Sequence, residues 1–125
     1  LLPEQCFTIH KLLGYVPEKN LPALYRGTMA FISPSLYEGF GMTLLEAMAC
    51  GCPVITTDKG AMPEVVGKAG ILVDPYNIDD LVRAMKKISE DKSLRITMRD
   101  KGLKQGRQFT WEQFTQGILG VINEN

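Results

Sequence analysis

Glu38 and Glu46 lie eight positions apart, on either side of the turn-forming residues Gly39, Phe40 and Gly41. A glycine-rich turn leaves backbone N–H groups open to a ligand. The apolar segment that follows predicts a helix, whose start adds unpaired N–H donors and the positive end of the helix dipole. This combination is typical of a site for an anion, most often a phosphate. Glu46 would then lie on the first turn of that helix, close to the group that carries the anion.

Both glutamates also fit a purely structural role at the start of a helix. Thr43 and Glu46 have the spacing of a capping box, in which each side chain bonds the backbone N–H of the other residue. Ser35 and Glu38 have the same spacing. Glu38 fits this role less well, because a glycine follows it at once and bends the chain. For Glu46 the residues alone leave the capping role and the ligand-binding role equally open.

The residues of the turn itself have ordinary explanations too. Gly39 and Gly41 alone would fit any tight turn, because a glycine pair is a weak signal. The apolar side chains of Phe40 and Met42 are expected to pack in the core. The turn therefore indicates a ligand site only in combination with the two glutamates.

The bulk composition is that of one globular domain. The chain has 125 residues, of which 45% are hydrophobic and 22% charged, and this suits a single domain with a core. Lys and Arg number 14, as do Asp and Glu, so no basic surface for a nucleic acid is expected. Neither a transmembrane helix nor a signal peptide is predicted. Because the chain begins at Leu1 and not at Met, we interpret it as a fragment of a longer protein.

Cysteine usage predicts reduced thiols and a cytoplasmic location. The chain has three cysteines, Cys6, Cys50 and Cys52, and an odd number in a chain that can build a core argues against a disulfide framework. Cys50 and Cys52 have the appearance of half a metal site, but His10 is the only histidine and no second ligand pair is present. We expect small buried residues at a turn from helix to strand, and no metal.

The order of predicted elements is that of an α/β fold. Short apolar runs rich in β-formers predict strands, and Gly, Pro and Asn residues mark their ends. The predicted strands cover residues 6–14, 29–33, 54–57 and 70–74. The predicted helices cover residues 21–27, 44–49, 63–67, 78–88, 93–105 and 110–122.

Two of these helices carry more detailed predictions. Asn20 is expected to cap the helix at residues 21–27. The helix at residues 78–88 has one apolar face at helical spacing, formed by Ile78, Leu81, Val82, Met85 and Ile88.

The alternation of strands and helices places the two glutamates in the fold. Short connections between alternating elements imply a parallel sheet with right-handed crossovers and helices on both faces. In such sheets ligands bind at the carboxyl ends of the strands. Residues 33–41 directly follow the strand predicted at residues 29–33, so the turn lies where a ligand would bind.

Residues 35–55 closely resemble the signature of glycosyltransferase family 4, also called glycosyl transferase group 1. The match consists of the glutamate pair with seven residues between, the Gly-Phe-Gly turn and the segments that follow. It continues through residues 21–25, 62–66, 70–75 and 109–111. Members are retaining, nucleotide-sugar-dependent enzymes of the GT-B fold. The resemblance implies that residues 1–125 are the C-terminal nucleotide-sugar-binding domain, a Rossmann-like three-layer α/β/α domain with a parallel sheet, and that the N-terminal acceptor domain is missing.

The resemblance implies a role for each residue of the turn. Glu38 would be the catalytic residue, bonding hydroxyls of the donor sugar and lying near its anomeric carbon. Gly39, Phe40 and Gly41 would line the sugar and the diphosphate through their backbone. Whether such a glutamate acts covalently or electrostatically is unsettled for the family, and we expect an electrostatic and positioning role.

The residues after the turn would bind the nucleotide. The N–H groups around Met42, Thr43 and Leu44 would meet the phosphates at the helix start. Glu46 would bind the ribose hydroxyls, and loop residues near Val16 would contact the base. The helix start would stabilise the leaving diphosphate without a metal, so no cofactor is expected and the nucleoside-diphosphate sugar is a substrate.

The activity implied by the resemblance is transfer of a sugar, such as mannose or another hexose, to a glycan or lipid-linked acceptor. The acceptor would bind the missing N-terminal domain, and the full-length protein would be cytoplasmic or would contact the cytoplasmic face of a membrane peripherally. The family also uses an upstream Arg and Lys to hold the diphosphate, and this pair is not identifiable here. Thr43 stands where many relatives have Pro, a change that should preserve the helix start. Because the basic pair and the acceptor domain are missing, we expect the isolated chain to have little or no transferase activity.

Two alternative functions stay open at this point. The first is a non-catalytic module that binds a nucleotide sugar, which an intact glutamate pair without the basic diphosphate clamp would favour. The second is a GT-B-fold sugar-nucleotide epimerase or hydrolase. Such enzymes lack this spacing of glutamates, and release of free sugar from the donor would support this alternative.

Overall fold

The computed structural model describes residues 11–110, 112, 113, 115, 116 and 119. A short 3-10 helix, η2 (Glu18–Asn20), leads into α1 (Leu21–Gly27). The central elements, in chain order, are β1 (Phe31–Ser33), α2 (Met42–Ala49), β2 (Val54–Thr57), α3 (Met62–Val66) and β3 (Ile71–Val73). Two longer helices follow, α4 (Ile78–Glu90) and α5 (Lys92–Gly106).

The three strands form one parallel sheet in the order β1-β2-β3. Phe31 pairs with Val54, and Ile55 pairs with Ile71. Because each crossover brings the chain back to the same end of the sheet, all three strands have their carboxyl ends at one edge. The predicted parallel α/β arrangement is thus confirmed.

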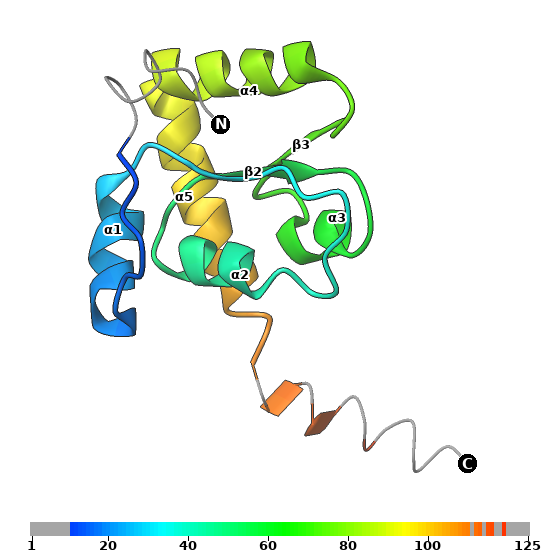
Figure 1. The fold of residues 1–125 in the computed structure, drawn as a ribbon. Helices are drawn as coiled ribbons and strands as arrows, with labels where there is room; N and C mark the ends of the chain where they lie inside the picture. The colour runs from blue at the N-terminus through cyan, green and yellow to red at the C-terminus, as the bar shows by residue number, and fades with distance from the viewer. Residues whose placement is uncertain (1–10, 111, 114, 117–118, 120–125) are drawn as a thin grey trace.

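Each face of the sheet is covered by helices, as Figure 1 shows for α4 on one side and α2 and α3 on the other. Val54 of β2 belongs to a buried cluster with α2 and α3, whereas Ile55 belongs to a second cluster with α4 and α5. Successive residues of a strand point to opposite faces, so the alternation of Val54 and Ile55 divides the core into these two layers. The three-layer prediction is therefore correct.

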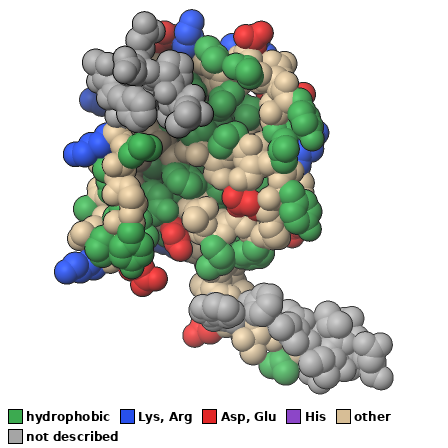
Figure 2. Space-filling view, in the orientation of Figure 1, with side chains coloured by type: hydrophobic (Ala, Val, Ile, Leu, Met, Phe, Trp, Pro, Cys, Tyr) green, Lys and Arg blue, Asp and Glu red, His purple; other side chains and the backbone are tan. Residues whose placement is uncertain are grey.

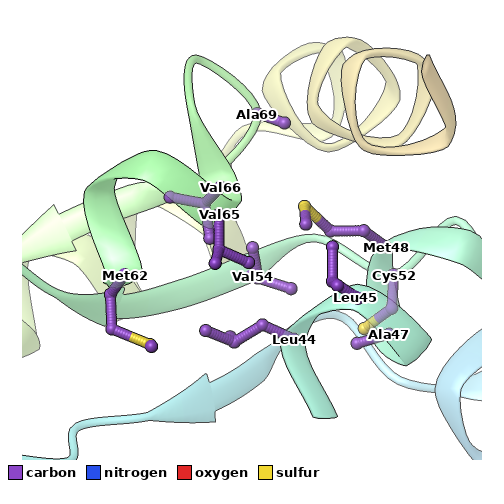
Figure 3. Close-up of a cluster of buried hydrophobic side chains, with 10 residues drawn as sticks. All are labelled: Leu44, Leu45, Ala47, Met48, Cys52, Val54, Met62, Val65, Val66 and Ala69. Atoms are coloured by element: carbon purple, nitrogen blue, oxygen red, sulfur yellow. The ribbon is translucent and has the colours of Figure 1, made fainter. Parts of the chain in front are cut away.

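The α2–α3 layer fixes the helix that follows the Gly-Phe-Gly turn. Leu44, Met48 and Met62 are almost fully buried, and Figure 3 shows them around Val54 with the side chains of Leu44 and Met62 pointing toward one another. On its other side α2 packs closely on α5, where Gly102 lies against Met48. The start of α2 is thus anchored by the core and not by the loop alone.

Several predicted boundaries and caps differ from the structure. The sequence predicts the first strand at residues 6–14. Residues 11–14 are irregular and form no strand, and residues 6–10 lie outside the described residues. Asn20 does not cap α1 with its side chain, because η2 runs directly into α1 and leaves Asn20 in a helical conformation. The helix predicted at residues 110–122 falls largely outside the described residues.

The apolar face predicted for α4 is partly wrong. Ile78, Val82 and Met85 are exposed, whereas Ala84 and Ile88 are buried. Within the described residues, only the stripe of α4 that faces the sheet and α5 is covered, where Ala84 and Ile88 pack with Val73 and Met98. Asn77 caps the helix by accepting a hydrogen bond from the Asp80 N–H.

Candidate functional site

The loop that carries Glu38 is tied to the end of β2 by two buried threonines. The Thr56 hydroxyl donates to the Ser33 carbonyl at 2.9 Å, and the Thr57 hydroxyl donates to the Ser35 carbonyl at 2.8 Å. Both threonine side chains are fully buried. Ser33 ends β1 and Thr57 ends β2, so the loop leaves from the carboxyl edge of the sheet.

Two serine hydroxyls hold the half-buried carboxylate of Glu38. Ser35 donates to Oε1 at 2.9 Å and Ser33 donates to the same oxygen at 3.3 Å. The described residues donate no hydrogen bond to the other oxygen, Oε2. The Ser35–Glu38 spacing is therefore not a helix cap, because no helix begins at Ser35.

The chain enters α2 through Gly41, which has a left-handed backbone conformation with φ 73° and ψ 44°. A Cβ at this position would lie 2.9 Å from the Cε atom of Met62, so both the dihedral angle and the close packing favour glycine. The N–H groups of Leu44 and Leu45 donate to the Gly41 carbonyl at 3.0 and 3.3 Å.

The helix therefore begins at Met42, two residues earlier than predicted. In an α-helix the first N–H groups have no intrahelical acceptor, and here these belong to Met42 and Thr43. The Leu44 N–H is engaged with Gly41, and the Leu44 side chain is fully buried. Of the three residues predicted to present donors, Met42 and Thr43 are the ones whose N–H groups are free by helix geometry.

The early start of α2 removes the predicted capping box. Gly41 is the N-cap residue and receives no side-chain bond, so Thr43 lies inside the first turn and does not cap. Glu46 instead lies exposed on α2, and the Tyr25 hydroxyl of α1 donates to its Oε2 atom at 3.5 Å. Of the two roles left open for Glu46, the capping role is therefore wrong, and the ligand-binding role stays a prediction.

Tyr25 is held in place by packing of its ring. The ring meets that of Phe31 edge to face, with centroids 5.5 Å apart. Burial raises the pKa of the Tyr25 hydroxyl, and the negative charge of Glu46 raises it further. The phenol thus remains a hydrogen-bond donor at neutral pH. The sequence gives no local signal for this contact, because Tyr25 and Glu46 come from different helices.

The expectation that Phe40 and Met42 pack in the core is wrong. Their exposed fractions are 45% and 53%, and both line a cavity of about 550 Å³ together with Leu45, Gln108, Phe109, Thr110 and Gln113. The Phe40 and Phe109 rings meet edge to face with centroids 6.0 Å apart. Figure 2 shows hydrophobic side chains over much of one face of the molecule, with acidic side chains among them.

Gly39 and Val16 are less constrained than the rest of the predicted site. Gly39 is exposed, and a Cβ added there would meet no atom within 4 Å. Val16 is half-buried in the irregular segment before η2. Its contact with a nucleotide base stays a prediction. On the far side of the loop, a Cβ at Gly60 would lie 3.5 Å from the Glu38 carbonyl oxygen, so the segment after β2 borders the site.

The described residues contain no group of three or more His, Cys, Asp or Glu side chains that could hold a metal ion. Cys52 is buried and Cys50 half-buried in the turn between α2 and β2. Burial raises the pKa of the Cys52 thiol to about 11, so this thiol is uncharged at neutral pH and packs as a small apolar group. Among the described helices, none is both long and apolar enough to cross a membrane.

Known proteins match this chain in sequence and in fold. The family profile described as Glycosyl transferases group 1 matches residues 8–105. The chain belongs to this glycosyltransferase family. An O-antigen chain mannosyltransferase B from Escherichia coli is 44% identical over 111 residues, which cover 89% of this chain and 29% of that protein. The chain thus spans less than a third of the length of this relative.

Two solved structures resemble the fold of this chain. A sucrose-phosphate synthase from Thermosynechococcus elongatus superposes with a TM-score of 0.79 at 28% identity, over 92% of this chain and 31% of that one. The C-terminal domain of a glycosyl transferase group 1 protein from Francisella tularensis superposes with a TM-score of 0.65 at 31% identity, over 74% of this chain and 49% of that one. The predicted Rossmann-like domain of a GT-B glycosyltransferase is therefore confirmed.

Proposed function

We propose that this chain is the donor-binding C-terminal half of a retaining glycosyltransferase that takes a hexose from a nucleoside-diphosphate sugar. Its membership of the group 1 family supports glycosyl transfer. The similarity to the solved C-terminal domain of a glycosyl transferase group 1 protein supports the assignment to that half of an enzyme. Residues 1–125 form the donor domain, and the acceptor binds a preceding domain.

One observation carries the proposal: an oriented carboxylate and an open helix start lie at the same edge of the sheet. Glu38 has one oxygen held by Ser33 and Ser35, and α2 begins only a few residues later at Met42. A carboxylate favours positive charge, whereas a helix N-terminus favours negative charge. Cleavage of a sugar–phosphate bond develops both charges side by side.

In this proposal the two ends of the breaking bond meet different groups. Glu38 faces the donor sugar and stabilises the positive character that develops at the anomeric carbon. The backbone of Gly39, Phe40 and Gly41 lines the sugar and the diphosphate. The N–H groups at the start of α2 stabilise the leaving diphosphate, as preorganised donors do in an oxyanion hole, and no metal is required. The acceptor attacks from the face from which the diphosphate departs.

The nucleoside binds beside the diphosphate. Glu46 lies within the first turns of α2 with its carboxylate exposed, and a carboxylate accepts hydrogen bonds from two adjacent ribose hydroxyls. The segment around Val16 contacts the base through its backbone. The nucleotide is UDP or GDP.

The relatives support mannose as the sugar and a glycan or lipid-linked molecule as the acceptor. The 44% identical relative is named an O-antigen chain mannosyltransferase. The full-length protein acts in the cytoplasm or at the cytoplasmic face of a membrane. Because the acceptor site and the basic diphosphate clamp belong to the rest of the enzyme, the isolated chain has little or no transferase activity.

Substitution of each glutamate in the full-length protein tests the proposal. Glu38→Ala should lower turnover on the order of a hundredfold, as removal of one transition-state-stabilising group does elsewhere, and should leave affinity for the free nucleoside diphosphate nearly unchanged.

Glu46→Gln should weaken nucleotide binding by about 1–3 kcal/mol, because its hydrogen bonds to ribose are charge-assisted. Glu90→Gln, an exposed glutamate at the end of α4, serves as the control. A fully active Glu38→Ala variant would contradict the catalytic role.

A further inference from the structure

Glu38 is the centre of a hydrogen-bond network that reaches from the loop into the sheet. Ser33 and Ser35 donate to its Oε1 atom at 3.3 and 2.9 Å, and the two serine oxygens are themselves 3.4 Å apart. We infer that Ser33 and Ser35 are positioning residues, which occupy Oε1 so that Oε2 is the oxygen presented to the donor sugar. This inference rests on the proposed function, in which Glu38 faces that sugar.

The two serines restrict a rotation that is otherwise soft. The terminal torsion of a glutamate side chain has broad, shallow minima, so an unrestrained carboxylate turns freely. Two hydroxyl donors that converge on one oxygen, the nearer of them Ser35 at 2.9 Å, favour a single orientation of the carboxylate plane. Because Glu38 is only half-buried, packing alone would not impose this orientation.

The serines are in turn fixed by the sheet. The hydroxyls of Thr56 and Thr57 donate to the carbonyls of Ser33 and Ser35. Both threonines have no exposed surface, and an unpaired hydroxyl in such a place costs free energy. The buried strand β2 thus determines where the serine backbone lies, and the serine hydroxyls pass that position on to the carboxylate. A site built on a strand in this way is held more rigidly than one built on a loop alone.

A purely structural role for the serines makes a different prediction. If the hydroxyls only stabilised the loop, their removal would lower folding stability and would affect nucleotide binding and turnover together. If they orient Glu38, their removal lowers turnover, and the effect disappears once Glu38 itself is gone. The two roles are therefore separable by a double-mutant cycle.

The experiment uses the full-length protein with a mannose-containing glycan as acceptor, and it follows release of nucleoside diphosphate from GDP-mannose or UDP-glucose, whichever the wild type consumes. Ser35→Ala should lower kcat about tenfold or more, while the Kd for the free diphosphate, from calorimetry, stays within about twofold. Ser35→Thr keeps the hydroxyl and should retain most of the activity. Ser93→Ala, an exposed serine at the start of α5, is the matched control.

The double variant Ser35→Ala/Glu38→Ala should be no slower than Glu38→Ala alone. An equal additional loss from Ser35→Ala in that background, or full activity of Ser35→Ala, would overturn the inference while leaving the proposed function intact. Full activity of Glu38→Ala would instead overturn the proposed function. If Ser35→Ala does not fold, Ser35→Cys keeps the size of the side chain and weakens the donor, and it must lower kcat in the same direction.

Discussion

The two glutamates have different surroundings, which suit different tasks. The Glu38 carboxylate is half-buried and receives two hydroxyl bonds on one oxygen. The Glu46 carboxylate is exposed, and the hydroxyl of Tyr25 donates to it from a neighbouring helix. A fixed carboxylate suits a role beside a reacting atom, whereas an exposed one suits reversible binding of hydroxyl groups.

At the scale of single residues, Tyr25→Phe tests whether the tyrosine supports Glu46. The substitution removes the hydroxyl bond but keeps the ring that packs on Phe31. We expect nucleoside-diphosphate binding, measured by calorimetry, to weaken by about 0.5 kcal/mol, the low end for a hydrogen bond because this one is long, with little change in the melting temperature. Tyr76→Phe, an exposed tyrosine, is the control.

The same tyrosine variant should have no effect on binding when Glu46 is already Gln. A loss of affinity of the same size in both backgrounds would mean that Tyr25 acts through the fold and not through the carboxylate.

At the scale of elements, the start of α2 determines how the motif is interpreted. The sequence predicts a helix from Leu44 with Thr43 as its cap, because a Thr-x-x-Glu spacing favours that arrangement. In the structure the helix begins at Met42, because Gly41 has a left-handed conformation that only glycine adopts without strain. The sequence pattern alone could not distinguish these two helix starts, because the choice depends on how Gly41 packs on Met62 in the folded structure.

Gly41→Ala tests the importance of this helix start. The left-handed dihedral angles and the close approach of Met62 should destabilise the variant by about 1–3 kcal/mol in chemical denaturation. Gly39→Ala is the matched control, because its added Cβ has open space and should change stability by less than about 0.5 kcal/mol. Equal stability of the two variants would contradict a structural requirement for glycine at position 41.

The sheet was more predictable than the faces of the helices. The runs at residues 29–33, 54–57 and 70–74 contain β1, β2 and β3, because buried parallel strands are short and continuously apolar. The exposure of Ile78, Met85, Phe40 and Met42 was not predictable. Apolar residue type does not reveal how far a neighbouring layer extends, and for Phe40 and Met42 it did not reveal the cavity that they line.

At the scale of the whole molecule, the candidate site was predictable in outline but not in its supporting contacts. Glu38 follows a predicted strand in the sequence. The rule that ligands bind at the carboxyl edge of parallel sheets then made this position a candidate site. The contacts from Thr56, Thr57 and Tyr25 join segments at least 21 positions apart in the sequence, so no local pattern could indicate them.

This chain corresponds to part of the length of its relatives. It belongs to the glycosyl transferase group 1 family and covers 29% of the mannosyltransferase relative. In the proposed function, the nucleotide of the donor binds residues of this chain, so its binding can be measured without the acceptor.

Titration calorimetry of this chain with GDP, UDP and ADP, each with and without an attached sugar, is the decisive test of a nucleotide site at the start of α2. We expect saturable binding of GDP or UDP in preference to ADP, weakened in Glu46→Gln and unchanged in Glu90→Gln. Circular dichroism of each sample establishes that the protein is folded. Absence of binding by the folded chain, or equal binding by wild type and Glu46→Gln, would contradict the assignment of a nucleotide site to the start of α2.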